Sequence, residues 1–78
     1  MTGSQLRAAR ALLGWSAEAL SEASKVGVAT IRRAEGEAGA VRMTAANADA
    51  VQRALEAAGV AFIEESRGIG VLLKAEDE

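Results

Sequence analysis

Residues 16–35 constrain the fold more than any other stretch of the chain. Ser16 is a natural helix N-cap, because its hydroxyl can accept a hydrogen bond from the free backbone N–H groups of a first helical turn. Apolar residues then recur at helical spacing, this spacing is interrupted between residues 24 and 27, and it begins again afterwards. These apolar residues are Ala19, Leu20 and Ala23 before the interruption and Val28, Ile31 and Ala34 after it. The stretch predicts two short helices, about 17–23 and 28–35, joined by a tight turn.

Two helices joined in this way form a helix-turn-helix, whose second helix is shaped to enter the major groove of DNA. Further residues in the same register extend the pattern over about residues 4–55. They are Leu6, Arg10, Leu13, Gly14, Trp15, Ser16, Glu18, Leu20, Ala23, Val26, Thr30, Ile31 and Glu35. On these residues the chain resembles the Cro/repressor-like (Xre-type) helix-turn-helix family of bacterial and phage transcription regulators.

The resemblance implies a recognition helix at about 28–35 that binds double-stranded DNA. The positions that read bases or neighbouring phosphates in that family are Gly27, Val28, Ala29, Arg32 and Arg33 here. An arginine can donate two hydrogen bonds to guanine. The family often has Ser, Gln or Arg where this chain has the three residues 27–29, so we expect specificity to depend on the two arginines and on DNA shape. The alternative is that both arginines are ordinary solvated charges.

Three further positions belong to the expected DNA interface. Ser16 and Ala17 begin the helix that crosses the sugar-phosphate backbone, and free N–H groups at a helix start bind phosphate. Many relatives have Gln where Ala17 stands, which removes one usual contact. Arg42 lies in the loop that approaches the backbone or minor groove in relatives. Lys25 lies in the turn where relatives often have a left-handed Gly, and we interpret it as a solvated charge.

Two features are expected to be architectural. Relatives often pair an arginine of the first helix with a glutamate at the end of the third, and Arg10 and Glu35 occupy those positions. We expect this pair to hold the recognition helix against the first helix. Trp15 is expected to pack in or near the core, on the first and fourth helices.

The remaining helices follow from capping residues and apolar spacing. Ser4, or Thr2, is expected to cap a first helix that runs to about Leu13 and ends at Gly14. Its buried stripe would be Leu6, Ala9 and Leu13. A loop over residues 37–43 then leads to Thr44, which would cap a fourth helix at about 45–58. The inner face of that helix would be Ala48, Val51, Leu55 and Ala58, with Gly59 as its stop.

The pattern changes after residue 59. Residues 60–64 and 71–74 are rich in β-branched and large apolar side chains, and residues 66–70 between them contain two glycines. They predict a β-hairpin, followed by an acidic tail at 75–78. The expected fold is therefore mainly α: a helix-turn-helix domain of four helices over residues 1–59, then a C-terminal hairpin and tail over residues 60–78.

An isolated two-stranded hairpin is marginally stable in water. We therefore expect a homodimer in which two hairpins join into one antiparallel sheet about a two-fold axis. Such a dimer would bury Phe62, Ile63, Val71, Leu72 and Leu73. It would also place two recognition helices roughly 34 Å apart, as a palindromic operator requires. The alternative is that the hairpin folds back on the fourth helix of its own chain.

Composition excludes several functions. The 78 residues suit one domain, and the absence of Cys and His removes disulfides, thiolate metal sites and the commonest general base. Glu64 and Glu65 are adjacent on a strand and point to opposite faces, so they form no paired-carboxylate site. We expect no enzyme, cofactor or metal. Without a signal peptide or an apolar run near ~18 residues, a cytoplasmic protein outside the membrane is expected.

The net charge of −2 is unevenly distributed along the chain. Residues 1–53 carry seven basic and five acidic residues, whereas residues 54–78 carry two basic and six acidic ones. This asymmetry suggests an N-terminal part that faces DNA and an acidic part that is turned away from it. We expect a sequence-specific transcriptional regulator, a dimeric repressor or autorepressor. The alternative is an antitoxin or other interaction protein whose C-terminal hairpin masks a protein partner such as a toxin.

Overall fold

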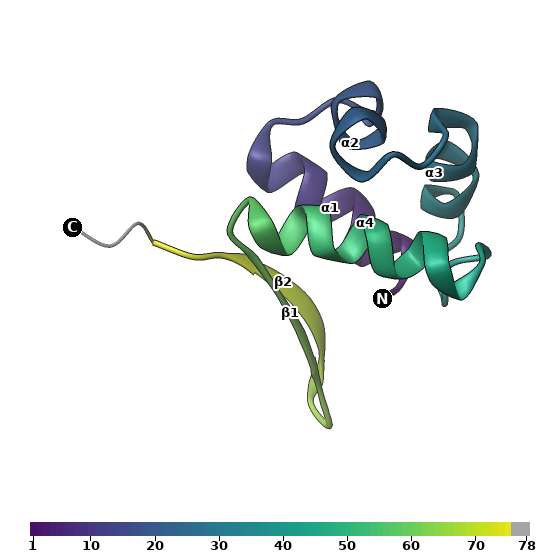
Figure 1. Cartoon of the computed structure of the whole chain (residues 1–78). Helices are drawn as coiled ribbons and strands as arrows, with labels where there is room; N and C mark the ends of the chain where they lie inside the picture. The colour runs from purple at the N-terminus through teal and green to yellow at the C-terminus, as the bar shows by residue number, and fades with distance from the viewer. Residues whose placement is uncertain (76–78) are drawn as a thin grey trace.

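A computed structural model describes residues 1–75 as helices followed by one β-hairpin (Figure 1). The elements in chain order are α1 (Gly3–Leu13), α2 (Ala17–Ser24), α3 (Val28–Glu35), α4 (Ala45–Ala57), β1 (Val60–Glu65) and β2 (Gly68–Leu73). The predicted layout of four helices and a hairpin is confirmed over this range. The predicted acidic tail lies, from residue 76 onward, outside the described residues. Within residues 1–75, no helix has both the length and the apolar character needed to span a membrane.

The helix ends are set by local caps. α1 begins at Thr2, the second of the two predicted caps. The Thr2 hydroxyl accepts from the Gln5 backbone N–H at 3.0 Å, and the Gln5 side-chain oxygen accepts from the Thr2 N–H at 2.9 Å. This reciprocal capping box explains why the helix starts before Ser4. Gly14 ends α1 in the left-handed conformation, with φ 68°, as predicted.

The core lies where the four helices meet the base of the hairpin. Its fully buried large side chains are Leu6, Leu20, Ile31, Val51, Leu55 and Val60. Of the predicted stripe on α1, Leu6 and Ala9 are buried and Leu13 is half-buried. On α4, Val51 and Leu55 are buried, whereas Ala48 and Ala58 are half-buried. α1 and α4 therefore bury the faces that their apolar spacing predicts. On α2, Leu20 is buried, but Ala19 is only half-buried and Ala23 is exposed.

Gly3 joins the start of α1 to the segment that follows α3. Its backbone N–H donates to the Gly39 carbonyl at 2.9 Å. A Cβ atom at Gly3 would lie only 1.8 Å from the Glu37 carbonyl oxygen. Because the two backbones approach this closely, only glycine fits at this position.

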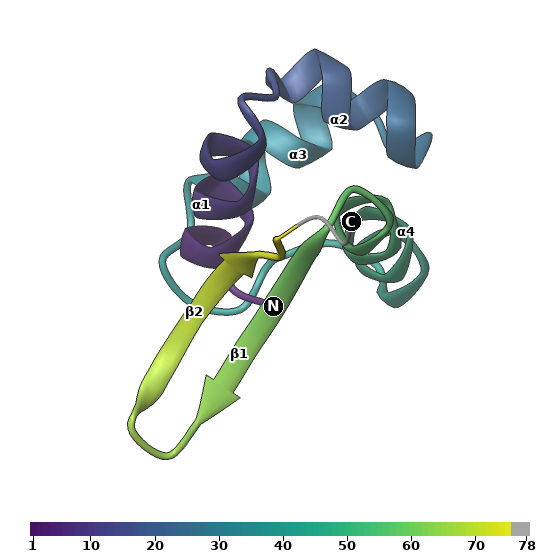
Figure 2. The same ribbon diagram turned by 90° about the vertical axis from the view of Figure 1, so that its left-hand side faces the viewer.

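The hairpin extends away from the helical body (Figures 1 and 2). Its six residue pairs run from Val60 opposite Leu73 at the base to Glu65 opposite Gly68 at the tip. Only Ser66 and Arg67 remain for the turn. The predicted five-residue connection is therefore wrong: Gly68, Ile69 and Gly70 lie inside β2. Glycine favours turns in sequence reasoning, but here continuous pairing with β1 keeps these residues in the ladder.

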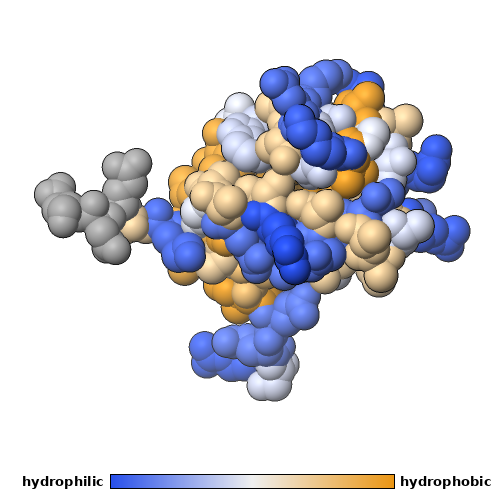
Figure 3. Space-filling view, in the orientation of Figure 1, coloured by the Kyte–Doolittle hydropathy of each residue, from blue (hydrophilic) through white to orange (hydrophobic). Residues whose placement is uncertain are grey.

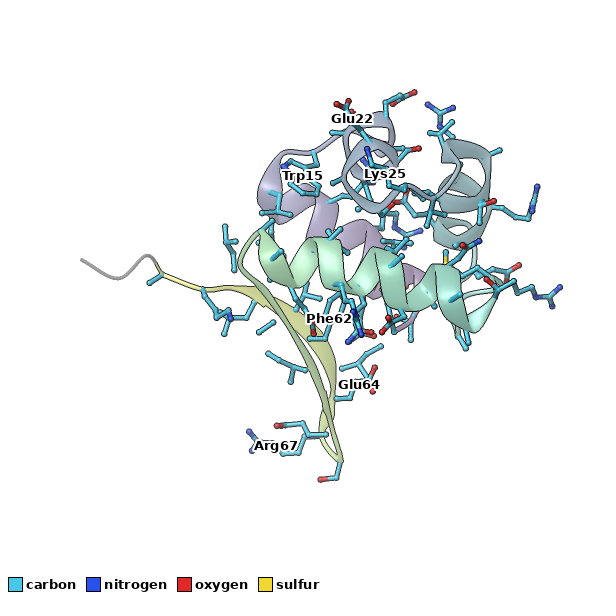
Figure 4. The ribbon with its side chains drawn as sticks, in the orientation of Figure 1. Trp15, Glu22, Lys25, Phe62, Glu64 and Arg67 are labelled. Carbon is cyan, nitrogen blue, oxygen red and sulfur yellow. The ribbon has the colours of Figure 1, made fainter. Side chains whose placement is uncertain are left out.

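One face of the hairpin packs on the helices. Alternation along the strands places Val60, Phe62 and Glu64 on this face, with Ile69, Val71 and Leu73 opposite them. We call it the inner face. Phe62 and Val71 pack against the core, and Figure 4 shows Phe62 beneath α4. The Gln5 side-chain nitrogen donates to the carbonyls of Ile63 at 3.2 Å and Gly70 at 3.0 Å, which fastens α1 to both strands.

The other face of the hairpin points away from the helices. It carries Ala61, Ile63 and Glu65 of β1 and Gly68, Gly70 and Leu72 of β2. We call it the outer face. Ile63 is 38% exposed and Leu72 is 51% exposed. The five residues predicted for a dimer interface are thus divided between the two faces: Phe62 and Val71 pack on their own core, as the fold-back alternative predicts, while Ile63, Leu72 and Leu73 are exposed.

Candidate nucleic-acid interface

The two sides of α3 differ sharply in burial. Ile31, Ala34 and Glu35 are buried against the other helices. Ala29, Arg32 and Arg33 are exposed, and their spacing of three and four residues places them on one face of the helix. α3 therefore presents a small basic face to solvent.

Two predicted positions at the start of α3 have different surroundings. Gly27 is exposed and is the N-cap, where no side chain bonds the first-turn N–H groups. Val28 was expected on the outward face, but it is half-buried and packs against the core. The reason is that Val28 lies one helical turn before the buried Ile31, on the same side of α3. The outward face is therefore smaller than predicted.

The start of α2 lies at the same surface. Ser16 is exposed, and its hydroxyl accepts from the Ala19 N–H at 3.0 Å, as expected for a cap. Ala17 is only 6% exposed, and its side chain belongs to the core. Ala17 can therefore offer a ligand only its backbone N–H. The Ala17 side chain is used for packing.

An ion pair between Glu18 and Arg32 joins the first turn of α2 to α3. Both side chains are largely exposed, at 63% for Glu18 and 58% for Arg32. A hydrogen bond from its own backbone N–H, followed by the positive charge of Arg32, lowers the pKa of Glu18. The arginine predicted to read bases is thus held by a carboxylate in the free protein.

The other predicted basic residues lie in the connections. Lys25 ends α2 in the left-handed conformation, with φ 63°, and its N–H donates to the Ser21 carbonyl at 2.8 Å. The prediction that this turn needs a left-handed residue is confirmed. Figure 4 shows the exposed side chains of Lys25 and Glu22 on α2, far from the hairpin. Arg42, between α3 and α4, is 80% exposed, and its Nε lies 3.7 Å from a Glu37 carboxylate oxygen.

Arg10 holds α3 from its buried side. Its guanidinium donates to both carboxylate oxygens of Glu35, at 2.5 and 2.7 Å, and to the Trp15 carbonyl at 2.7 Å. Arg7 donates to the Glu35 carbonyl at 2.9 Å. The hydrogen bond with Glu35 raises the pKa of Arg10 above its ordinary value. The predicted Arg10–Glu35 pair is confirmed, and Trp15 is half-buried against the core as expected.

Sequence reasoning missed two residues that shape these surfaces. Glu18 was not expected to hold Arg32, and Gln5 was not expected to fasten the hairpin. A first-turn acid and a capping-box Gln are visible in the sequence, but their partners are 14 and 58 residues away. Only the tertiary fold brings these pairs together.

No protein-family model matches the chain, and no curated protein matches it. Hydrophilic residues gather over α2 and at the tip of the hairpin, whereas hydrophobic residues lie at the base of the hairpin (Figure 3).

Proposed function

We propose that this protein is a sequence-specific DNA-binding regulator whose α3 enters the major groove. The observation that carries the proposal is the outward face of α3, where Ala29, Arg32 and Arg33 are exposed on a helix whose other side is buried. A short helix held rigidly from behind, with arginines on its free side, suits bidentate contact with guanine.

The start of α2 supports the same docking. The Glu18–Arg32 ion pair brings the first turn of α2 next to α3. The exposed Ser16 cap and the backbone N–H groups that follow it are therefore available to a phosphate beside the groove. By occupying an operator, the protein would repress transcription of the adjacent gene, or of its own gene if it is an autorepressor.

The test is a salt series of binding by the purified chain to DNA fragments from its own promoter region. Retardation should weaken steeply with salt, because arginine contacts release counterions from DNA. Arg33→Ala should weaken binding and reduce the salt slope by about 1 if it contacts a phosphate.

The matched control is Arg53→Ala. Arg53 is an arginine on α4 that is 77% exposed and pairs with Asp49. Its loss should leave binding to the promoter fragment almost unchanged. Equal effects of the two substitutions, or no retardation at any salt concentration by the folded chain, would contradict the proposal.

A second candidate function is protein interaction through the hairpin, as in an antitoxin. The observation that favours it is the distribution of exposed large apolar side chains: Ile63, Ile69, Leu72 and Leu73 in the hairpin, with Leu12 on α1. Co-purification of a second protein that is lost in hairpin variants, together with absent DNA binding, would favour this function.

A further inference from the structure

The outer face of the hairpin alternates large and small residues along its length. From base to tip, the β2 side reads Lys74, Leu72, Gly70 and Gly68. The β1 side reads Gly59, Ala61, Ile63 and Glu65, and the Lys74 N–H extends the ladder by donating to the Gly59 carbonyl at 2.8 Å. Leu72 therefore stands next to a glycine on its own strand, and Ile63 stands next to an alanine.

The glycines near the tip leave a shallow hollow of about 380 Å³, lined by Ile63, Glu65, Arg67, Gly68, Ile69 and Gly70. Neither Gly68 nor Gly70 has an atom within 4 Å of where a Cβ would stand. Leu72, 51% exposed, projects from the same face nearer the base. One face thus carries both a projection and a hollow. Figure 2 shows the two strands of this hairpin extending below α1 and α4.

Two exposed charges of opposite sign also lie at the two ends of the outer face. Lys74 lies at the base of the outer face and Glu65 at its tip, and both are exposed. Residues 59 to 65 span about 20 Å at ~3.4 Å per residue, so the two charges cannot pair within one chain. At the tip, Glu65 also lies 3.7 Å from the Nε of Arg67, in a contact whose side chains are 90% exposed for Arg67 and 56% exposed for Glu65. Turning the face end for end brings Lys74 of each chain next to Glu65 of the other, in competition with this exposed contact.

We propose that the outer face binds the outer face of a second copy of this chain, with the two hairpins stacked in opposite directions. A two-fold axis between the faces, across the strands, lays β1 on the partner's β1 and β2 on the partner's β2. Leu72 then covers the partner's Gly70, and Ile63 covers the partner's Ala61. Lys74 reaches over the partner's Gly68 to the carboxylate of the partner's Glu65.

Stacking the faces accounts for features that joining the edges does not. If two hairpins extended one sheet edge to edge, Ile63 and Leu72 would stay on a solvent-facing surface. Packed sheets lie about 10 Å apart with interdigitating side chains, which is the space that a leucine over a glycine fills. The proposal does not depend on DNA binding, because the outer face belongs to the hairpin and not to α2 or α3.

The first test is sedimentation of the full chain over a concentration series. We expect a monomer–dimer equilibrium at micromolar concentration. Leu72→Glu should raise the dimer dissociation constant roughly 30-fold or more, as loss of a buried anchor does. The melting temperature at low concentration should change little, because Leu72 is exposed in the monomer. Edge-joined hairpins would tolerate this variant, so an unchanged dissociation constant would overturn the proposal.

Leu12→Glu is the matched control, since Leu12 on α1 is 44% exposed and lies outside the outer face. It should leave the dissociation constant unchanged. Dissociation by Leu12→Glu and not by Leu72→Glu would place the contact elsewhere. A chain that stays monomeric at millimolar concentration would also overturn the proposal and would point to a partner of another sequence.

The second test uses the two charges. Glu65→Lys and Lys74→Glu should each raise the dissociation constant about tenfold, because both symmetric pairs become repulsive. A mixture of the two variants should form a mixed dimer, since each chain then offers a charge opposite to that of the other. Native mass spectrometry resolves the three species when one of the two variants is uniformly labelled with ¹⁵N.

The control mixture combines Lys74→Glu with Glu22→Lys. Glu22 lies on α2, far from the hairpin (Figure 4), so its reversal has no outer-face partner and should yield no preferred mixed dimer. Equal mixing in both experiments would show that only net charge matters and would overturn the proposed register.

Discussion

Arg10 and Glu35 face each other through two side-chain hydrogen bonds, from Nε to Oε2 at 2.5 Å and from Nη2 to Oε1 at 2.7 Å. The side chains are only 20% and 10% exposed, respectively. The remaining guanidinium nitrogen of Arg10, Nη1, donates to the Trp15 carbonyl at the junction of α1 and α2. One guanidinium therefore ties α1 to α3 and to the connection that leads into α2.

Removal of Glu35 should be strongly destabilising. Glu35→Ala leaves the guanidinium of Arg10 partly buried without its anionic partner, and breaking such a pair costs about 3 kcal/mol in the free energy of unfolding. The melting temperature should fall by roughly 10 °C or more for a domain of this size. Thermal unfolding followed by circular dichroism measures it.

Asp49→Ala is the comparison for that experiment, because it breaks an ion pair with Arg53 whose side chains are 61% and 77% exposed. It should cost no more than about 0.5 kcal/mol. If both variants melted like the unmodified chain, the Arg10–Glu35 pair would have no role in holding α3.

Gln5→Glu should loosen the hairpin from α1. The substitution keeps an oxygen that can accept from the Thr2 N–H, but it replaces the amide that donates to the Ile63 and Gly70 carbonyls. A carboxylate facing two carbonyl oxygens leaves them unsatisfied, at a cost of about 1–3 kcal/mol. Hydrogen exchange of the β1 and β2 amides should accelerate more than exchange in α4. Gln52→Glu on α4 replaces an amide that donates to Glu56 at 3.2 Å and should leave the exchange of the β1 and β2 amides as it is.

Lys25→Gly should stabilise the protein. Lys25 holds φ 63° at the end of α2, and a side chain in this region costs about 1 kcal/mol relative to glycine. Chemical denaturation should show a gain of that size. Lys25→Ala removes the same charge but keeps a Cβ, so it should show no such gain. Equal gains in both variants would assign the effect to charge and not to backbone strain.

Helix boundaries could be predicted from the sequence because their causes are local. Ser16 and Thr44 each accept from the backbone N–H three residues ahead, at 3.0 and 3.1 Å. Gly14 terminates α1 with a positive φ, as Gly59 does after α4. The Arg10–Glu35 pair was predicted from the family resemblance and not from a local pattern, because its two residues are 25 positions apart.

The errors concern residues whose roles are set by distant partners. Gly68 and Gly70 favour a turn by composition, but cross-strand pairing with Glu65 and Ile63 keeps them in β2. No role was predicted for Gly3, whose backbone lies so close to the Glu37 carbonyl that a Cβ has no room. Val28 is a different case: it was expected to face outward from its position in the motif, but its three-residue spacing from Ile31, a local pattern, already places it toward the core. Local patterns cannot show which neighbour a residue will meet.

The pKa of Glu18 offers a direct check on the α2–α3 contact. A carboxyl carbon titration by NMR should give a midpoint below the ordinary value of 4.5, since the charged form is favoured by its own backbone N–H and by Arg32. The contribution of this group to stability is therefore present above pH 4.5 and lost as the pH falls through the lowered pKa. Arg32→Ala should raise the midpoint only in part, because the backbone hydrogen bond is the larger cause. Arg53→Ala should leave it unchanged.

The Glu18–Arg32 contact also predicts how DNA affinity responds to substitution, if α3 is the reading helix. The Nη2 group of Arg32 donates to Glu18, so the ion pair competes with a bidentate contact from Arg32 to a base or phosphate, and the carboxylate itself repels the DNA backbone. Glu18→Gln should therefore raise affinity about tenfold at low salt and steepen the salt slope by about 1 as Arg32 becomes free. Glu56→Gln on α4 makes the same charge change at another exposed carboxylate and should give a much smaller rise.

The double variant separates the two effects of Glu18. In an Arg32→Ala background, Glu18→Gln can only remove repulsion, so its gain should shrink toward that of Glu56→Gln. A gain of full size in that background would show that Glu18 acts by its charge alone. A fall in affinity for Glu18→Gln would mean that the carboxylate positions Arg32 for contact, or accepts from a cytosine amino group itself. The ion pair would then be part of the reading surface and not a restraint on it.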